Sequence, residues 1–224
     1  MQSPVVADYL ETIYNLTMEG DCVIAARLAR RFKVSAPNVA AVLRRMELDG
    51  LVVRDERKGI GLTAKGRARA ESVLRRHRLA ERFLLEVLGL DWIVAHEQAH
   101  HLEHSFTVEL EERIDAVLRH PATCPHGNPI PGGVPDASRY LQDLGAFRLT
   151  EAVEQQEVEV VCISEVVEDE TALLRYAGQN GMRPGARLRL LSREPGGALS
   201  AKAGESSVVF GPDFASKIWV RACR

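Results

Sequence analysis

A stretch dense in proline and glycine, residues 120–138 (HPATCPHGNPIPGGVPDAS), divides the chain into two parts of different character. Proline fixes its own φ angle and donates no backbone hydrogen bond, so this stretch can be neither a helix nor a central strand. Before it, apolar residues recur at helical spacing, and after it short β-type runs alternate with turn residues. We therefore expect a mainly α fold in which an irregular connection leads to a small β domain.

The first third of the chain has the element order of a winged helix-turn-helix. Two amphipathic segments precede KVSAPNVAAVLRRMELDG, in which Ser35 is a suitable N-cap, Pro37 suits the first helical turn and Gly50 ends the helix. A strand, the basic tip DERKG and a return strand follow, and Thr63 is expected to cap a long helix. The expected helices are 4–18, 24–32, 36–49 and 64–88, and the expected strands are 51–54 and 61–63.

The formal net charge of −2 conceals a strong asymmetry along the chain. Residues 27–78 contain 15 Lys or Arg against 5 Asp or Glu, whereas Arg113 is the only Lys or Arg between residues 97 and 115. A basic segment beside an acidic, histidine-rich one indicates two tasks, holding phosphate and holding a cation. The alternative for the basic segment is a small helical bundle with a solvated charged face.

The rest of the chain is expected to hold one more long helix and then the β domain. The helix is predicted over residues 91–119. Beyond the connection, five short β-type runs and one helical segment, 170–179, indicate a small barrel-like domain. The predicted strands lie within 157–167, 186–192, 197–203, 206–210 and 217–222.

Composition excludes several classes of protein. No segment approaches the roughly 18 uninterrupted apolar residues of a membrane span, and the N-terminus lacks the pattern of a signal peptide, so we expect a cytoplasmic protein without a membrane partner. The four cysteines show no CxxC spacing, which argues against a disulfide framework or a zinc ribbon.

The stretch HEQAHHLEH at residues 96–104 places several metal-ligand side chains on one helical face. His96, His100, Glu103 and His104 follow the spacing i, i+4, i+7 and i+8. The preceding helix carries His77 and Glu81 one turn apart, and the first helix carries Asp8 and Glu11 at i, i+3. If these helices pack together, the nitrogen and oxygen ligands can converge on a cation.

The first five residues of this stretch, HEQAH, also fit the H-E-x-x-H pattern of a zinc peptidase. That interpretation needs His96 and His100 as zinc ligands, Glu97 as general base and an open position for water. A face that continues through Glu103 and His104 favours a saturated site over an open catalytic one, so we expect no enzyme activity. The other alternative is an ordinary solvated polar face.

The motifs RRHRLAERFLLEVLGLD, HEQAHHLEH and PHGNPIPG, behind a winged helix, resemble the diphtheria-toxin-repressor family of metal-dependent transcriptional regulators. That family includes iron-dependent regulators and manganese transport regulators. The resemblance covers essentially the whole chain. It implies a DNA-binding domain at 1–72, a metal-binding and dimerisation domain with its Pro-rich connection at 73–140, and an SH3-like domain at 141–224.

The resemblance implies a first metal site built from Asp8, His100, Glu103 and His104. Iron-type members have Met and Cys at the first two of these positions, so this chain lacks the soft sulfur donors. Carboxylate and imidazole ligands suit Mn²⁺ and still accept Fe²⁺, and Zn²⁺, Co²⁺ or Cd²⁺ can substitute in vitro. The pair Asp8 and Glu11 is the one found in the manganese regulators, where His77 joins the same cluster.

A second, ancillary site is implied by the iron-type members with three domains. There His77, Glu81 and His96 are completed from the C-terminal domain, whose carboxylate matches Glu170. The family's partner Gln falls on Leu173, a departure for which Glu168 or Asp169 can substitute. Whether this site is separate from the first stays open. Cys124 and His126 can add a soft site, but we favour them as plain loop residues.

The expected partners are a second copy of the chain and double-stranded palindromic operator DNA. The third helix is expected to present four residues near base edges: Ser35, Pro37, Asn38 and Ala41. Ala41 replaces a Gln of the iron-type members, so the operator is expected to differ. Basic residues are expected to hold phosphates: Arg27, Arg44, Arg45, Arg57 and Lys58. Candidates for dimerisation, which core packing explains equally well, include Phe83, Leu84, Val87, Leu90, Trp92 and Ile93.

Overall fold

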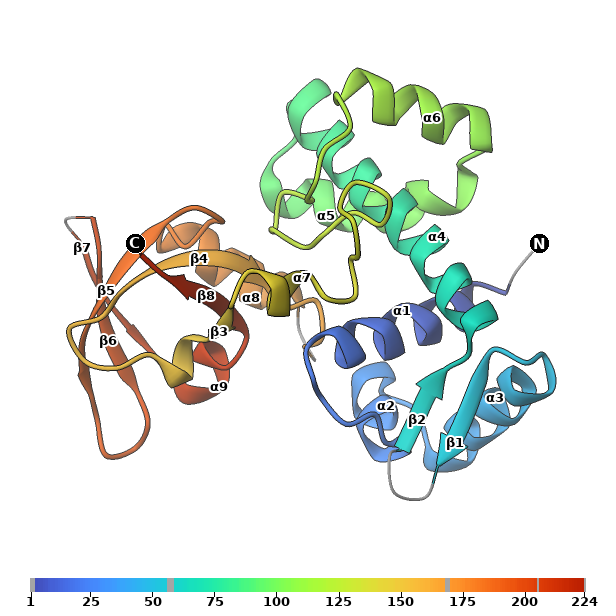
Figure 1. Cartoon of the computed structure of the whole chain (residues 1–224), viewed down its shortest axis with the longest axis horizontal. Helices are drawn as coiled ribbons and strands as arrows, with labels where there is room; N and C mark the ends of the chain where they lie inside the picture. Colours follow the sequence, from blue (N-terminus) through green and yellow to red (C-terminus); the bar gives the residue numbers. More distant parts are fainter. Residues whose placement is uncertain (1–2, 56–58, 168–169, 205, 224) are drawn as a thin grey trace.

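The computed structural model describes residues 3–55, 59–167, 170–204 and 206–223, apart from the Glu170 side chain. Figure 1 shows a helical part, an irregular connection and a β part, as the proline-rich stretch predicts. Among the described residues, no helix is long and apolar enough to cross a membrane. The expected fold class, mainly α with a small C-terminal β domain, is confirmed.

The N-terminal unit is the predicted winged helix-turn-helix. Its helices and wing strands share one apolar core, in which the rings of Tyr9 and Phe32 stack with centroids 4.3 Å apart. Ser35 occupies the N-cap of the third helix, but its side chain makes no capping hydrogen bond with a described residue. The elements are α1 (Pro4–Met18), α2 (Ala25–Phe32), α3 (Ala36–Leu48), β1 (Val52–Asp55) and β2 (Gly59–Leu62).

Helix α4 (Ala64–Arg82) joins this unit to the helical middle part, since it packs against both α1 and α5 (Trp92–Leu102). Thr63 caps α4 as predicted, accepting a hydrogen bond of 2.9 Å from the Gly66 backbone N–H. A Cβ on Gly66 would overlap the carbonyl oxygen of Leu51, so close packing of the wing on α4 requires glycine there. The helix ends in a π-helical turn, η1 (Phe83–Val87).

The single helix predicted over residues 91–119 is wrong. The chain instead forms α5, a 3-10 turn η2 (Glu103–Ser105) and a separate helix α6 (Val108–Val117). Phe106 is extended and buried, and the Thr107 hydroxyl accepts a hydrogen bond from the Leu110 backbone N–H at 3.2 Å, which starts α6. The first backbone N–H groups of a helix have no partner within that helix, and a Ser or Thr side chain at the N-cap accepts a hydrogen bond from one of them. The Thr107 cap therefore marks the start of a new helix.

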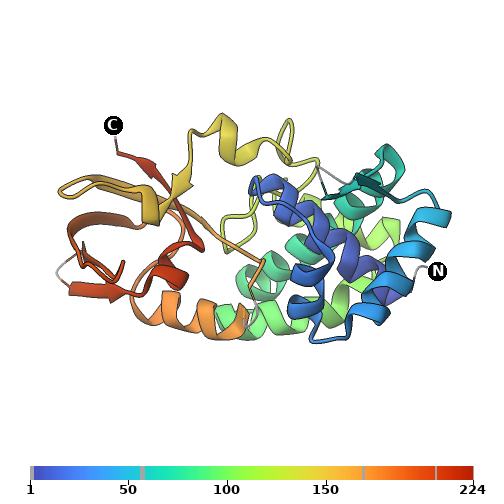
Figure 2. The same ribbon diagram turned by 90° about the horizontal axis from the view of Figure 1, so that it is seen from below.

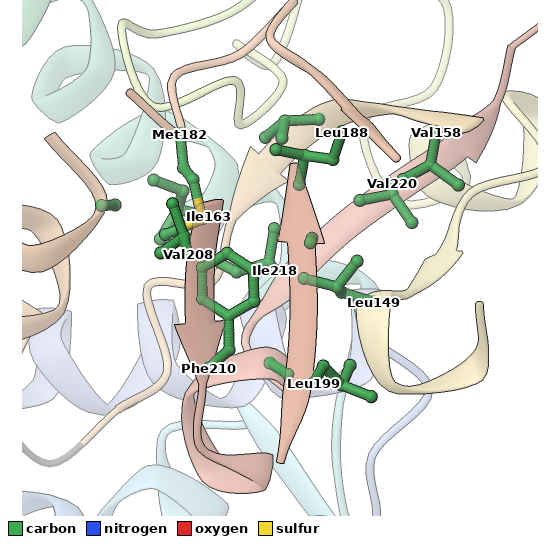
Figure 3. Packing of buried hydrophobic residues seen from close by; sticks show 14 of the residues in the cluster. Leu149, Val158, Ile163, Met182, Leu188, Leu199, Val208, Phe210, Ile218 and Val220 are labelled. Carbon is green, nitrogen blue, oxygen red and sulfur yellow. The ribbon is translucent and has the colours of Figure 1, made fainter. Parts of the chain in front are cut away.

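The C-terminal part is a small antiparallel sheet of the SH3-like type, built from the five predicted strands and from β3 (Phe147–Arg148), which was not predicted. Leu149, Val158, Leu199, Phe210 and Val220 form part of its core (Figure 3). The strands are β3 (Phe147–Arg148), β4 (Glu157–Ile163), β5 (Arg187–Arg193), β6 (Leu199–Ala203), β7 (Ser206–Phe210) and β8 (Ile218–Ala222). Their order in the sheet is β3-β8-β4-β5-β6-β7. The helices and helical turns of this part are α7 (Tyr140–Asp143), η3 (Leu149–Glu151), α8 (Glu170–Gln179) and α9 (Pro212–Ala215).

The β domain packs directly on the helical middle part. Trp92, at the start of α5, belongs to the apolar core of the β domain, and a Cβ on Gly178 of α8 would lie 3.3 Å from its ring. Figures 1 and 2 show α8 beside α5. Trp92 is therefore buried within one subunit, and Leu84 is buried in the apolar core of the helical middle part, whereas Val87 and Leu88 are half exposed.

Candidate metal centre

The central residue of the site is His77 of α4, whose side chain is buried. Its Nδ1 lies 2.6 Å from Glu103 Oε2 and its Nε2 lies 3.3 Å from Glu81 Oε1. The imidazole therefore joins carboxylates from two different elements. Burial alone would lower the pKa of His77, but Glu81 and Glu103 outweigh it and raise this pKa well above its ordinary value.

The first group of ligands consists of His77, His100 and Glu103, which offer ligand atoms within 4.8 Å of one another. His104 adjoins it, with Nε2 3.4 Å from Glu103 Oε1. Because the chain tightens into η2 at Glu103, this carboxylate points inward and is 1% exposed, while His100 and His104 are 52% and 37% exposed. The group thus has a buried carboxylate behind a solvent-accessible pair of imidazoles.

Asp8 and Glu11 of α1 interact electrostatically with the charged residues of the first group. Burial raises the pKa of Asp8, on which His100 and Glu103 act with opposite signs. Burial and then Glu103 raise the pKa of Glu11 to about 8. Among the described residues, neither belongs to a group whose ligand atoms all lie within 4.8 Å, so the structure places α1 beside the first group and does not close the site.

Several buried oxygen atoms around the first group fit a bound cation. Asp8 Oδ1, Glu11 Oε1 and Glu103 Oε1 are buried and make no hydrogen bond with a described residue. A buried carboxylate oxygen without a partner costs about 1–3 kcal/mol or more, and an ion pair with a divalent cation removes that cost. The donors are carboxylate and imidazole only, which is the chemistry expected for a hard or borderline divalent ion.

A second group is centred on Glu81, which is fully buried on α4. Its Oε1 is 2.7 Å from His96 Nδ1, 3.1 Å from His126 Nδ1 and 3.3 Å from His77 Nε2. Burial alone would raise the pKa of Glu81, but His126 and His77 outweigh it and hold this pKa well below its ordinary value. The predicted trio His77, Glu81 and His96 is thus brought together, and it shares His77 with the first group.

The connection adds a third group, Glu81, Cys124 and His126, all buried and within 4.8 Å. The structure thus brings Cys124 and His126 of the connection together with a carboxylate of α4, while their interpretation as plain loop residues stays a prediction. His126 Nε2 and Glu81 Oε2 are buried without a hydrogen-bond partner among the described residues. In the sequence, the spacing Cys-Pro-His was the one indication that Cys124 and His126 could act together as ligands. Their contact with Glu81 depends on how the connection folds over α4.

Of the positions expected to close the ancillary site from the C-terminal domain, the structure describes the side chain of Leu173. Leu173 is buried in the core of the β domain, so its apolar side chain has a packing role. Glu170 begins α8, but its side chain lies outside the described residues, as do Glu168 and Asp169.

The two histidines of HEQAH point into different groups. His96 contacts Glu81, whereas His100 contacts Glu103. Glu97 is exposed on α5 and its Oε1 accepts a hydrogen bond of 3.4 Å from the Thr171 hydroxyl of α8. The arrangement that a peptidase needs, two histidines on one ion beside the glutamate, is not formed by these residues.

The predicted base-reading face of α3 is open to solvent. Ser35, Pro37, Asn38 and Ala41 are exposed, as are Arg44 and Arg45. Arg27 is half-buried and its guanidinium forms an ion pair of 2.7 Å with Asp21, whereas exposed Arg45 forms a looser one of 4.0 Å with Asp49. Arg57 and Lys58 at the hairpin tip lie outside the described residues.

Family models match three successive parts of the chain. Residues 1–60 match the iron-dependent repressor N-terminal DNA-binding domain, residues 63–132 match the iron-dependent repressor metal-binding and dimerisation domain, and residues 147–222 match the FeoA domain. The iron-dependent repressor IdeR of Mycobacterium leprae (strain TN) is 38% identical over 219 residues, which cover 95% of this chain and 94% of the relative. The chain belongs to the iron-dependent repressor family.

Relatives of both metal types lie within this family of metal-dependent transcriptional repressors. The diphtheria toxin repressor of Corynebacterium diphtheriae is 36% identical over 197 residues, covering 83% of this chain and 84% of the relative. The solved structure of the manganese regulator SloR has a TM-score of 0.82 at 31% identity, covering 99% of this chain and 100% of the other. A manganese-dependent transcriptional repressor in complex with manganese gives 0.83 at 32%, covering 97% and 100%.

Proposed function

We propose that this repressor is activated by Mn²⁺, with Fe²⁺ as the second candidate, and binds a palindromic operator as a homodimer to control metal-ion homeostasis genes. The observation that carries the choice of metal is the first group with its neighbours on α1, which offers carboxylates and imidazoles but no sulfur. Such ligands favour Mn²⁺ among the candidate ions, although they accept Fe²⁺. The relatives include both iron-dependent and manganese-dependent repressors, so their names support either ion.

The first site of the proposal consists of Asp8, Glu11, His77, His100, Glu103 and His104. A divalent cation supplies two positive charges that offset the carboxylates of Asp8, Glu11 and Glu103. Without this compensation the charged form of Glu11 is disfavoured, first by burial and then by repulsion from Glu103, and both effects raise its pKa. Because two of the three carboxylates lie on α1 and one on η2, their repulsion separates the DNA-binding unit from the middle part of the chain.

Helix α1 can transmit this change because its other face belongs to the DNA-binding unit. Leu10, Ile13 and Leu16 are fully buried in the same core as the apolar residues of α3. Moving α1 relative to α5 therefore moves α3 with it. In a dimer, the two α3 helices must lie about 34 Å apart to enter successive major grooves, so a fixed position of α1 favours operator binding.

We assign roles on DNA to the exposed residues of α3 and of the wing. Pro37 and Ala41 offer apolar contact to thymine methyls, and Asn38 and Ser35 offer hydrogen bonds to bases or phosphates. The phosphate-binding set is proposed to be Arg27, Arg44, Arg45, Arg57 and Lys58. Arg27 would have to leave Asp21 to join this set.

An ancillary cation is proposed at Glu81 and His96, which the structure holds together with His77. Glu170 stays a proposed closing ligand from the C-terminal domain. Cys124 and His126 give this site a sulfur and a further imidazole, so it would be softer than the first site. Its proposed role is to hold the connection on α4, since its ligands come from both.

A gel-shift titration of Mn²⁺, Fe²⁺ under anaerobic conditions, and Zn²⁺ on the protein's own promoter region tests the proposal. Mn²⁺ is expected to give half-maximal operator binding at a free concentration that cells supply, whereas Fe²⁺ and Zn²⁺ are expected to need more than their cellular supply. Operator binding by metal-free protein that equals binding by metal-loaded protein would refute metal activation. A response to Fe²⁺ and not to Mn²⁺ would leave the repressor function standing and refute the choice of metal.

A further inference from the structure

Helix α1 carries a polar stripe that continues past the two metal-facing carboxylates. Asp8, Glu11, Asn15 and Glu19 are spaced by three, four and four residues, so they lie along one side of the helix. Asp8 and Glu11 face the first group, whereas Asn15 and Glu19 are buried against the β domain. The same helix side therefore meets the metal ligands at one end and the C-terminal domain at the other.

The first of the two contacts with the β domain joins three parts of the chain. Asn15 Nδ2 donates a hydrogen bond of 2.9 Å to Glu165 Oε2, which follows β4. Arg78 of α4 forms an ion pair of 2.7 Å with the same oxygen and donates to Asn15 Oδ1 at 2.9 Å. The Arg78 side chain is fully buried. Removing one member would leave a buried charge or amide uncompensated, so α1, α4 and Glu165 hold one another in a single arrangement.

The second contact lies at the end of α1, away from the metal ligands. The Ser164 hydroxyl donates a hydrogen bond of 2.5 Å to Glu19 Oε1, and Arg148 Nη1 lies 3.4 Å from Glu19 Oε2. Arg148 also reaches Asp21 at 3.1 Å and stacks over the ring of Trp219 at 4.6 Å. Arg148 and Ser164 both belong to the β domain. The β domain therefore holds the C-terminal end of α1 by an ion pair and a buried hydrogen bond.

We infer that Ser164, Glu165 and Arg148 of the β domain are positioning residues for the first metal site, because they fix the helix that brings Asp8 and Glu11 to it. The inference rests on the proposed metal-activated function. An α-helix moves as a rigid body over this distance, about 12 Å from Glu11 to Glu19 at 1.5 Å per residue. Holding one end of α1 therefore restricts the position of the carboxylates at the other.

The coupling acts in both directions. If docking of the β domain raises metal affinity, metal binding stabilises the docked β domain by the same factor, since coupling free energies are reciprocal. Couplings of this kind are typically about 5–150-fold in affinity. In the metal-free protein, the contacts of the β domain would oppose the separation of α1 from the middle part of the chain, so losing them would weaken metal binding without removing a ligand.

The test compares Arg148→Gln and Ser164→Ala with a matched control, Arg221→Gln. Arg221 forms an ion pair of 2.7 Å with Glu159 within the same β domain and, in the described contacts, joins no residue of α1. Mn²⁺ affinity is measured from the EPR signal of free Mn²⁺, and operator binding from the Mn²⁺ concentration at half-maximal gel shift. Melting temperature and hydrogen exchange across α1 are measured on the same samples.

We expect Arg148→Gln and Ser164→Ala to need about fivefold or more Mn²⁺ for half-maximal operator binding, with faster exchange in the second half of α1, while Arg221→Gln behaves as wild type. A merely structural role would lower the melting temperature of all three variants and leave Mn²⁺ affinity unchanged, which would overturn the inference. If Arg148→Gln does not fold, Glu19→Gln replaces it, because it keeps an acceptor for Ser164 and removes only the charge. Wild type that ignores Mn²⁺ would refute the proposed function, and the inference with it; wild type that responds, with variants that respond equally, would refute the inference alone.

Discussion

The Nδ1 atom of His77 lies 2.6 Å from the Oε2 atom of Glu103, and this contact joins α4 to the turn after α5. The opposite nitrogen of the same ring faces Glu81 Oε1 at 3.3 Å. The first and second groups of ligands are therefore neighbours that share one imidazole. A neutral histidine offers one lone pair, so His77 can coordinate an ion in only one of the two groups at a time.

Glu103→Gln is expected to weaken activation by Mn²⁺ at least about tenfold, which corresponds to 1.4 kcal/mol. The change keeps the shape of the side chain but removes the buried negative charge that His77, His100 and His104 surround. The measurement is the Mn²⁺ concentration at half-maximal operator binding. Glu109→Gln, an exposed glutamate on α6, serves as the matched control. If Glu103→Gln and wild type needed equal Mn²⁺ concentrations for half-maximal operator binding, Glu103 would not be a ligand of the site.

The pH dependence of stability should carry the signature of Glu11. Burial raises its pKa in the folded, metal-free protein to about 8, from an ordinary value of 4.5 in the unfolded chain. Between these values the folded protein holds a proton that the unfolded chain releases, so this group's stabilisation is complete below about pH 4.5 and is lost as pH rises to about 8. Glu11→Gln should remove this loss.

The comparison is made by thermal unfolding of metal-free wild type and Glu11→Gln between about pH 6 and about pH 8. The melting temperature of the variant should rise relative to wild type as pH increases. Mn²⁺ affinity of wild type should increase over the same window, because binding displaces the proton. A difference in melting temperature that is independent of pH would contradict the raised pKa.

Cys124→Ser should alter the softer site without abolishing the first one. Cys124 is buried beside Glu81 and His126, and a thiolate bound to Co²⁺ gives a charge-transfer absorption that a hydroxyl does not. We expect this absorption in Co²⁺-loaded wild type and in a Cys162→Ser control, and its loss in Cys124→Ser. Retention of the band in Cys124→Ser would exclude sulfur ligation by this residue.

Two exposed residues of α3 should separate base reading from phosphate binding. Arg45→Ala is expected to weaken operator and unrelated DNA alike and to reduce the slope of log affinity against log salt by about 1. Asn38→Ala is expected to leave that slope unchanged and to reduce the preference for operator, at a cost of about 1–3 kcal/mol. Competition gel shifts at several salt concentrations measure both quantities. Reversed behaviour would exchange the two assigned roles.

The sequence was sufficient where the pattern is local. Helical spacing placed His96, His100 and Glu103 on one side of α5 and its extension, and turn residues marked the wing and the strands of the β domain. It misplaced the helix over 91–119, because apolar and charged residues continue through Phe106 and Thr107 while the break depends on Phe106 being buried in the middle part.

Contacts between distant segments were beyond the sequence. Cys124 and His126 meet Glu81 only because the connection folds back over α4, and the pairing of Arg78 with Glu165 depends on where the β domain docks. Leu173, which stands where the family has a ligand Gln, is part of a core whose other members lie on several strands and helices. In each case the deciding interaction joins residues from separate elements, for which no periodicity gives a signal.

The central claim is that α1 and the turn after α5 share one cation. A crystal structure of the Mn²⁺-loaded protein, with the ion located by anomalous scattering, tests it most directly. The account predicts an ion bound at once by Glu103 and by a carboxylate of α1, Asp8 or Glu11. An ion held by Glu103 and His104 with both carboxylates of α1 turned away into solvent would contradict it.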